Sequence, residues 1–222
     1  MTQNETWRKV DDYVVERLIP NDPVLEHVLS ANRNSGLPEI DVSPAQGKLL
    51  HIWARMQGAK RILEIGTLGG YSTVWLARAL PAEGKVVTLE LDPHHAQVAQ
   101  SNLALAGLDD KVEIRVGAAL QQLALMKEEN QAAFDLIFID ADKPNNPAYL
   151  QWALQFSHPG TVIIGDNVIR EGKIVNEQST DASVQGVRQF YDLIAEEPRL
   201  TATAIQTVGV KGYDGFIIAI VD

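Results

Sequence analysis

The sequence predicts an α/β fold, in which helices cover both faces of a mostly parallel sheet that follows an N-terminal helical segment. From residue 61 onward, short apolar runs alternate with segments of helical periodicity, as βαβ units do. Some runs, such as 136–139, are unbroken, as expected of strands buried on both faces. Charged or polar residues follow several runs directly, at the sheet edge where open parallel sheets bind ligands.

The length of 222 residues fits a single domain. We divide it into a helical N-terminal cap at 1–57 and an α/β core at 58–222. At 45% hydrophobic and 22% charged, the chain can bury an ample core and remain soluble.

Composition excludes several functional classes. The net charge of −10 argues against the broad basic surface that nucleic acids require, so a nucleic-acid partner is not expected. The absence of cysteine excludes disulfides, thiolate metal sites and a cysteine nucleophile. The N-terminus lacks a secretory signal and no apolar run approaches a membrane span, so we expect a cytoplasmic protein without membrane contact.

The N-terminal cap is predicted to hold three helices. Apolar spacing indicates a helix that ends at Pro20, and Asp22-Pro23 and Ser43-Pro44 each combine an N-cap residue with proline at the first helical position. We expect most apolar residues of these helices to pack as core. The loop at 36–48 could fold over a ligand cleft.

The core elements follow in order along the chain. Predicted strands are at 61–65, 86–90, 112–116, 136–139 and 160–165, with helices at about 71–80, 93–106, 119–127 and 149–156 between and after them. A polar loop at 170–182 precedes a helix at about 184–196. Two last strands, at 200–208 and 216–221, are joined by the turn-rich link 209–215, as in a hairpin.

The first strand ends in a glycine-rich turn. Its glycines, at positions 66, 69 and 70, do not fit the G-x-G-x-x-G pattern of NAD sites. Glu64 precedes Gly66 by two positions, and this E-x-G arrangement is typical of S-adenosylmethionine sites, with the carboxylate near the cationic amine of the ligand. Ser72, near the start of the next helix, could hold the ligand carboxylate. The alternative is an ordinary tight turn.

Two further strand ends extend this donor site. Glu90 closes the second strand, where an acidic side chain can accept both ribose hydroxyls of a nucleotide-like ligand. The Gly117-Ala118 pair after the third strand could line an adenine with backbone atoms, although small residues are common in such loops.

Oxygen donors follow two other strands of the sheet. Asp140 ends the fourth strand, and Asp166 and Asn167 end the fifth. Such a set suits Mg²⁺ or a similar hard cation, whereas no zinc-type His/Cys set is present. Lys143 lies three residues after Asp140, and burial beside a cation favours a neutral amine that can act as general base. Together these residues predict deprotonation of a cation-bound hydroxyl, whose oxygen then attacks a methyl group.

The motifs together resemble those of the cation-dependent class I O-methyltransferases, the group that includes caffeoyl-CoA and catechol O-methyltransferases. The resemblance covers essentially the whole chain. It rests on six stretches: Val42-Ser-Pro-Ala-Gln-Gly47, Leu63-Glu-Ile-Gly-Thr-Leu-Gly-Gly-Tyr-Ser72, Leu89-Glu90, Phe138-Ile-Asp-Ala-Asp-Lys143, Gly165-Asp-Asn167 and Tyr213-Asp-Gly215.

This resemblance implies a fold, ligands and residue roles. It implies a Rossmann-like, seven-stranded sheet with an antiparallel last strand, S-adenosylmethionine as methyl donor, Mg²⁺ (or Mn²⁺ or Ca²⁺), a small vicinal-dihydroxy aromatic acceptor and a homodimer. By position, Lys143 corresponds to the base, and Asp140, Asp166 and Asn167 to metal ligands. The implied donor-binding positions are Val42, Glu64, Gly66, Thr67, Ser72, Glu90, Ala118 and Asp140.

The acceptor is less defined than the chemistry. Asn145-Asn146-Pro147 departs from the usual continuation after the lysine. Arg170, Lys173 and Trp152 are possible substrate neighbours, but a solvated-loop or core role is the stronger expectation for each. Three other functions remain open. Methylation of a hydroxylated tRNA base is disfavoured by the acidic charge, and non-catalytic S-adenosylmethionine binding by the intact metal and lysine positions. A nicotinamide oxidoreductase, which the glycine pattern disfavours, is the most distant alternative.

Overall fold

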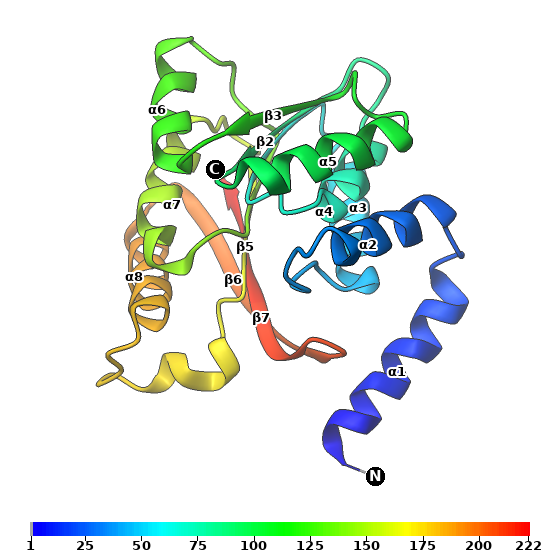
Figure 1. Cartoon of the computed structure of the whole chain (residues 1–222). Helices are drawn as coiled ribbons and strands as arrows, with labels where there is room; N and C mark the ends of the chain where they lie inside the picture. The colour runs from blue at the N-terminus through cyan, green and yellow to red at the C-terminus, as the bar shows by residue number, and fades with distance from the viewer. Residues whose placement is uncertain (1) are drawn as a thin grey trace.

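The computed structural model describes residues 2–222, which form one seven-stranded sheet of order β3-β2-β1-β4-β5-β7-β6 (Figure 1). The first five strands pair in parallel. β7 runs antiparallel to both β5 and β6, which confirms the predicted α/β fold with an antiparallel last strand. The strands are β1 (Arg61–Ile65), β2 (Lys85–Glu90), β3 (Val112–Val116), β4 (Leu136–Ile139), β5 (Val162–Asp166), β6 (Leu200–Gly209) and β7 (Gly212–Val221).

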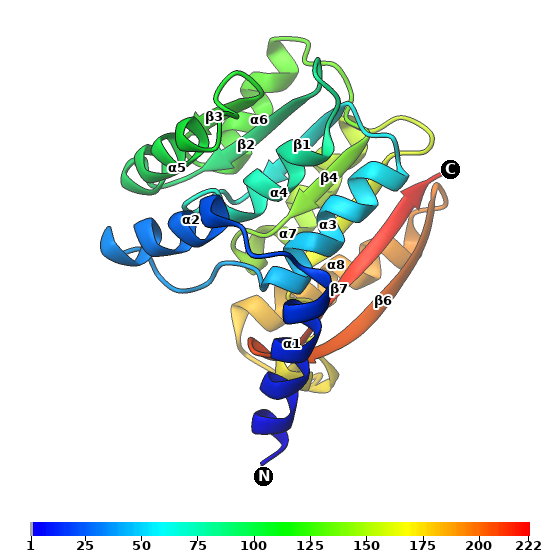
Figure 2. The ribbon, with the colours of Figure 1, turned by 90° about the vertical axis from the view of Figure 1, so that its right-hand side faces the viewer.

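Helices cover both faces of the sheet, as predicted (Figures 1 and 2). On one face lie α3 (Pro44–Met56), α4 (Tyr71–Ala79) and α5 (Pro93–Leu105), and on the other α6 (Ala119–Glu128), α7 (Asn146–Gln155) and α8 (Ala182–Glu196). Each face has its own apolar cluster, because the buried strands present side chains alternately to the two sides. Burial of these clusters is the main stabilising contribution.

Caps start the N-terminal helices where the sequence predicts. Asp22 precedes α2 (Pro23–Asn34), and its Oδ1 accepts a hydrogen bond from the Val24 amide at 3.0 Å. Ser43 precedes α3, and its Oγ accepts from the Gln46 amide at 3.2 Å. Both helices have proline at their first position, where no backbone donor is lost.

The prediction that apolar stripes of the cap pack as core is wrong for the first helix. α1 (Gln3–Leu18) has no buried residue, and Val10 and Leu18 are 55% and 69% exposed. The helix projects from the body of the molecule in both views (Figures 1 and 2). In α2 and α3 the expectation holds for Leu25, Val28 and Leu50, which are buried.

The C-terminal hairpin is longer than predicted. The link 209–215 is mostly strand, because β6 and β7 remain paired as far as Gly209 and Gly212. Only Val210 and Lys211 are left for the turn, and Gly212 takes the positive φ of 93° that follows it. This extension brings Asp214 beside the loop that follows β5, where it serves the site described below.

Two segments expected to be irregular contain short 3₁₀ helices. These are η1 (Lys143–Asn145), which leads into α7 earlier than predicted, and η2 (Arg170–Val175) in the loop after β5. Within residues 2–222, no helix combines the length and apolarity needed to cross a membrane.

Candidate active site

One cavity of about 670 Å³ opens at the carboxyl edge of the sheet, beside the ends of β1, β2 and β4. This is where the strand-end motifs were predicted to meet. The loop at 36–48, which the sequence suggests could fold over a ligand cleft, also reaches this cavity, since Ile40 and Asp41 line it. Among the predicted site residues, those that line it are Val42, Gly66, Thr67, Ser72, Glu90, Ala118, Asp140, Lys143 and Asn167.

The glycine-rich turn after β1 brings two loops unusually close. Gly66 has φ 105°, and a Cβ there would overlap the Asp140 backbone carbonyl. Gly70, with φ 85°, is the N-cap of α4. Only glycine adopts such backbone conformations without strain, so the turn lets a ligand contact the backbone of both loops.

Glu64 is placed differently from a donor-contacting residue. It is fully buried and does not line the cavity. Its carboxylate accepts hydrogen bonds from Ser72 Oγ at 2.6 Å, Thr73 Oγ1 at 2.5 Å and Thr88 Oγ1 at 2.7 Å. Burial raises the pKa of Glu64 to about 7. The residue therefore lies beneath the cavity wall and orients the Ser72 hydroxyl.

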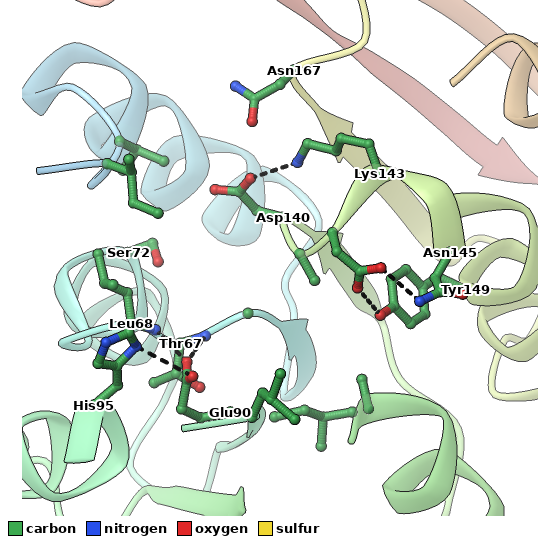
Figure 3. A pocket seen from close by; sticks show the side chains of 18 of the residues that line it. Thr67, Leu68, Ser72, Glu90, His95, Asp140, Lys143, Asn145, Tyr149 and Asn167 are labelled. Carbon is green, nitrogen blue, oxygen red and sulfur yellow. Dashed lines mark hydrogen bonds and ion pairs between the residues drawn. The ribbon is translucent and has the colours of Figure 1, made fainter. Parts of the chain in front are cut away.

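Glu90 is held in a fixed orientation at the other side of the turn (Figure 3). Its Oε2 accepts from the amides of Thr67 at 3.2 Å and Leu68 at 2.7 Å, and its Oε1 accepts from the Asp92 amide at 2.9 Å. His95 Nδ1 lies 3.5 Å from Oε1. The carboxylate is thus oriented before any ligand binds, and its remaining lone pairs can accept hydroxyl groups.

The acid–lysine cluster forms at the ends of β4 and β5. Lys143 is only 7% exposed, and its Nζ donates to Asp140 Oδ1 at 2.9 Å (Figure 3). Asp166 is buried behind the cavity wall, and burial together with the nearby Asp140 charge raises its pKa above the usual range. Asn167 adopts φ 53°, and its carboxamide lies beside the Asp140–Lys143 pair (Figure 3).

The donor set fits a hard divalent cation. Asp140 lines this end of the cavity with the Lys143 ammonium group and Asp166 lies just behind the wall, so a cation would relieve the repulsion that disfavours ionised Asp166. Within residues 2–222 no three His, Cys, Asp or Glu side chains gather as a metal site, and the carboxamide of Asn167 would supply the third protein ligand. Oxygen donors of this kind suit Mg²⁺ rather than zinc.

The sequence does not assign Gln46 or Tyr149 to the site. Gln46 Nε2 donates to Asp166 Oδ2 at 2.6 Å, across 120 positions of sequence. On the side of the cavity formed by η1 and α7, Tyr149 and Asn145 both donate to the carboxylate of Asp142 (Figure 3). Gln46 lies within the 42–47 stretch that the sequence singles out, but its partner is set only by tertiary packing.

The three possible substrate neighbours, Trp152, Lys173 and Arg170, lie in different surroundings. Trp152 stacks on Phe156 against the core. Lys173 is exposed and pairs with Glu171 at 3.0 Å. Arg170 lines the cavity, so the expectation of a purely solvated-loop role is wrong for this residue.

Comparison with known proteins supports the same interpretation. Residues 16–219 match a family model described as O-methyltransferase. A catechol O-methyltransferase of Niastella koreensis is 49% identical over 98% of this chain and 99% of its own length. A catechol O-methyltransferase of Mycobacterium tuberculosis is likewise 49% identical, over 100% of this chain and 99% of its own.

Solved structures of O-methyltransferases match the fold of this protein over essentially the whole chain. An O-methyltransferase from Bacillus cereus in complex with SAH is 59% identical, with a TM-score of 0.98 over 99% of this chain and 100% of that one. TomG from Streptomyces achromogenes, in complex with SAM, is 48% identical, with a TM-score of 0.96 over 100% and 99%. The motifs, the sheet order and these relatives lead to one assignment: the chain belongs to the O-methyltransferase family.

Proposed function

We propose that this protein transfers the methyl group of S-adenosylmethionine to one hydroxyl of a small catechol-like molecule, with the assistance of a divalent cation. The observation that carries the proposal is the shared cavity. It has a fixed carboxylate, Glu90, on one side and the acid–lysine cluster of Asp140, Lys143 and Asn167 on the other. The names and bound ligands of the similar proteins support the donor and the acceptor class.

The donor would lie along the turn after β1. Glu90 would accept the ribose hydroxyls, since its backbone contacts leave lone pairs free. The Ser72 hydroxyl, which donates to Glu64 in this structure, would turn its proton to the donor carboxylate, and Ala118 would lie beside the adenine. Val42, Gly66 and Thr67 would contribute the remaining wall.

Asp140, Asp166 and Asn167 would hold the cation. When bound, a divalent cation acidifies a hydroxyl group that it contacts and helps to orient both oxygens of a catechol. This preference for two neighbouring oxygens is the reason to expect a vicinal dihydroxy acceptor.

Lys143 would act as general base. Its backbone is fixed, because α8 packs so closely that a Cβ on Gly186 would overlap the Lys143 carbonyl. The acceptor hydroxyl gives its proton to the Lys143 amine while the oxygen forms a bond to the donor methyl carbon. The carbon–sulfur bond breaks and its electron pair stays on sulfur, which leaves S-adenosylhomocysteine.

The test is a methyl-transfer assay with S-adenosylmethionine and a panel of catechols, run with Mg²⁺ and with excess EDTA. We expect turnover with Mg²⁺ and its loss in EDTA, and a weakened cation dependence in Asp166→Ala. Full activity in EDTA would contradict the role of the cation. Failure to methylate any catechol, with donor binding intact, would contradict the acceptor class.

A further inference from the structure

The loop after β5 is held in a strained conformation at the acid–lysine end of the cavity. Asn167, Arg170 and Glu171 have φ values of 53°, 53° and 57°, although none is glycine. Such conformations persist only where surrounding contacts enforce them, and they concentrate at functional sites. The strained backbone therefore indicates that this loop positions a particular side chain.

Asp214 at the start of β7 enforces the conformation. Its Oδ1 accepts hydrogen bonds from the backbone amides of Ile169 at 2.9 Å and Arg170 at 3.0 Å. The Val168 amide donates to the Gly215 carbonyl at 3.0 Å, which ties the loop to β7 a second time. These contacts fix the backbone of Arg170, a residue that lines the cavity three positions after Asn167.

The Arg170 guanidinium has unused hydrogen-bonding capacity. Its side chain is two-thirds buried, yet its nearest acidic partner, Asp214 Oδ2, is 4.0 Å from Nη1. No acceptor among residues 2–222 lies within hydrogen-bonding distance of this guanidinium. Burying a charged group without hydrogen bonds is unfavourable, so a partner from solution would be favoured.

Neighbouring cations are already paired. Lys143 is bonded to Asp140 at 2.9 Å, Lys173 pairs with Glu171 at 3.0 Å, and Arg188 donates to the Ile174 carbonyl at 2.6 Å. Arg170 differs from all three in that its side chain makes no hydrogen bond within residues 2–222 and has only the 4.0 Å ion pair with Asp214. It is also on the wall of the cavity, whereas Lys173 and Arg188 are not.

We infer that Arg170 binds an anionic substituent of the methyl acceptor, which makes the preferred substrate class a catechol that carries a carboxylate. The planar guanidinium matches a carboxylate through two parallel hydrogen bonds. It would also offset the repulsion that an anionic acceptor meets from Asp140 and Asp166. This inference rests on the proposed function, because it concerns the acceptor of that reaction.

A matched pair of acceptors tests the inference. 3,4-Dihydroxybenzoate and its methyl ester share the catechol ring and differ in the charge of the substituent. In Arg170→Gln we expect kcat/KM for the acid to fall about 10- to 100-fold, as for loss of a charge-assisted contact, and that for the ester to change less than about 2-fold. Arg170→Lys keeps the charge without the planar fork, so it should retain part of the preference for the acid.

Lys173→Gln is the control, since it removes a cation from the same loop but outside the cavity. Its kcat/KM for both acceptors should equal that of the wild type. Binding of the acid to protein loaded with SAH and Mg²⁺, measured by calorimetry, decides the role of Arg170 even if neither acceptor is methylated, an outcome that would instead contradict the proposed function. The inference is overturned if Arg170→Gln affects acid and ester equally in turnover or leaves binding of the acid unchanged. If Arg170→Lys lowers kcat/KM for the acid as much as Arg170→Gln does, the loss reports a damaged loop, and the inference is likewise overturned.

Discussion

Lys143 is buried and held in a fixed position beside the proposed cation site, and burial beside a bound cation would favour the neutral amine that a general base needs. Its amine is held by Asp140 at 2.9 Å, and its side chain is shielded from bulk solvent. In Lys143→Met we expect turnover to fall at least about 100-fold, because the proton acceptor is lost. The affinity for SAH, measured by calorimetry, should stay within about 2-fold. Lys127→Met, an exposed lysine on α6, is the control, and an unchanged kcat in Lys143→Met would exclude the lysine as base.

Glu64 makes stability depend on pH. Burial raises its pKa from 4.5 to about 7, so between these values the folded protein keeps a proton that the unfolded chain has lost. Stability therefore falls as pH rises through this window, by up to about 3 kcal/mol for this group. In Glu64→Gln that contribution should be absent. Urea unfolding of the ligand-free protein between pH 4.5 and 8 measures it as the difference between the two curves, and parallel curves would contradict the prediction.

The residues that could be predicted from sequence are those that follow a strand directly. Asp140, Asp166 and Asn167 come straight after apolar runs, so their place at the sheet edge follows from the strand alone. The partners of Glu64 could not be predicted in this way. Thr88 lies beside Glu64 only because β1 and β2 pair in that register, which no local pattern specifies.

Among the elements, α3 connects the loop at 36–48, which lines the cavity, to the acid–lysine cluster. Gln46, in the first turn of α3, donates to Asp166. Gln57, at the C-terminal end of α3, donates to the Gly160 carbonyl shortly before β5. Both glutamines thus connect the same helix to segments beside the same strand. They differ in that only Gln46 touches a proposed metal ligand.

We expect Gln46→Leu to weaken cation binding about 3- to 10-fold, because Asp166 loses a hydrogen bond that stabilises its ionised form. Mn²⁺ affinity measured by electron paramagnetic resonance tests this without requiring turnover. Gln57→Leu removes a comparable bond at the far end of α3 and should leave Mn²⁺ affinity unchanged. Equal effects of the two substitutions would indicate a general loosening of the helix instead.

Element prediction succeeded where local pattern determines structure and failed where tertiary contacts do. β1, β3 and β4 have the predicted bounds, since an unbroken apolar run between turn residues is enough to define a buried strand. The hairpin link differs from the prediction because its glycines mark the turn and also continue the strand pairing. In α1 the apolar stripe predicts the helix that is observed, but a stripe does not reveal what covers it.

At the scale of the whole molecule, α1 and the edge strand β6 lie in contact, and both expose apolar side chains. The Val210 amide donates to Asp11 Oδ2 at 2.6 Å, which joins the helix to the end of the hairpin. Exposed on these two elements are Val10 at 55%, Leu18 at 69%, Ile205 at 48% and Val208 at 50%. Large exposed apolar side chains on two adjoining elements are typical of an interaction surface. Because the resemblance implies a homodimer, we expect a second copy to cover it.

Light scattering coupled to size exclusion should therefore give about twice the chain mass of 24.4 kDa. The double variant Val10→Glu/Leu18→Glu should run as a monomer with unchanged secondary structure, since both side chains are exposed and charge at an apolar interface opposes association. Leu125→Glu, an exposed apolar residue on α6, should remain dimeric. A monomeric wild-type protein would exclude the dimer, and a dimeric double variant would place its interface elsewhere than α1.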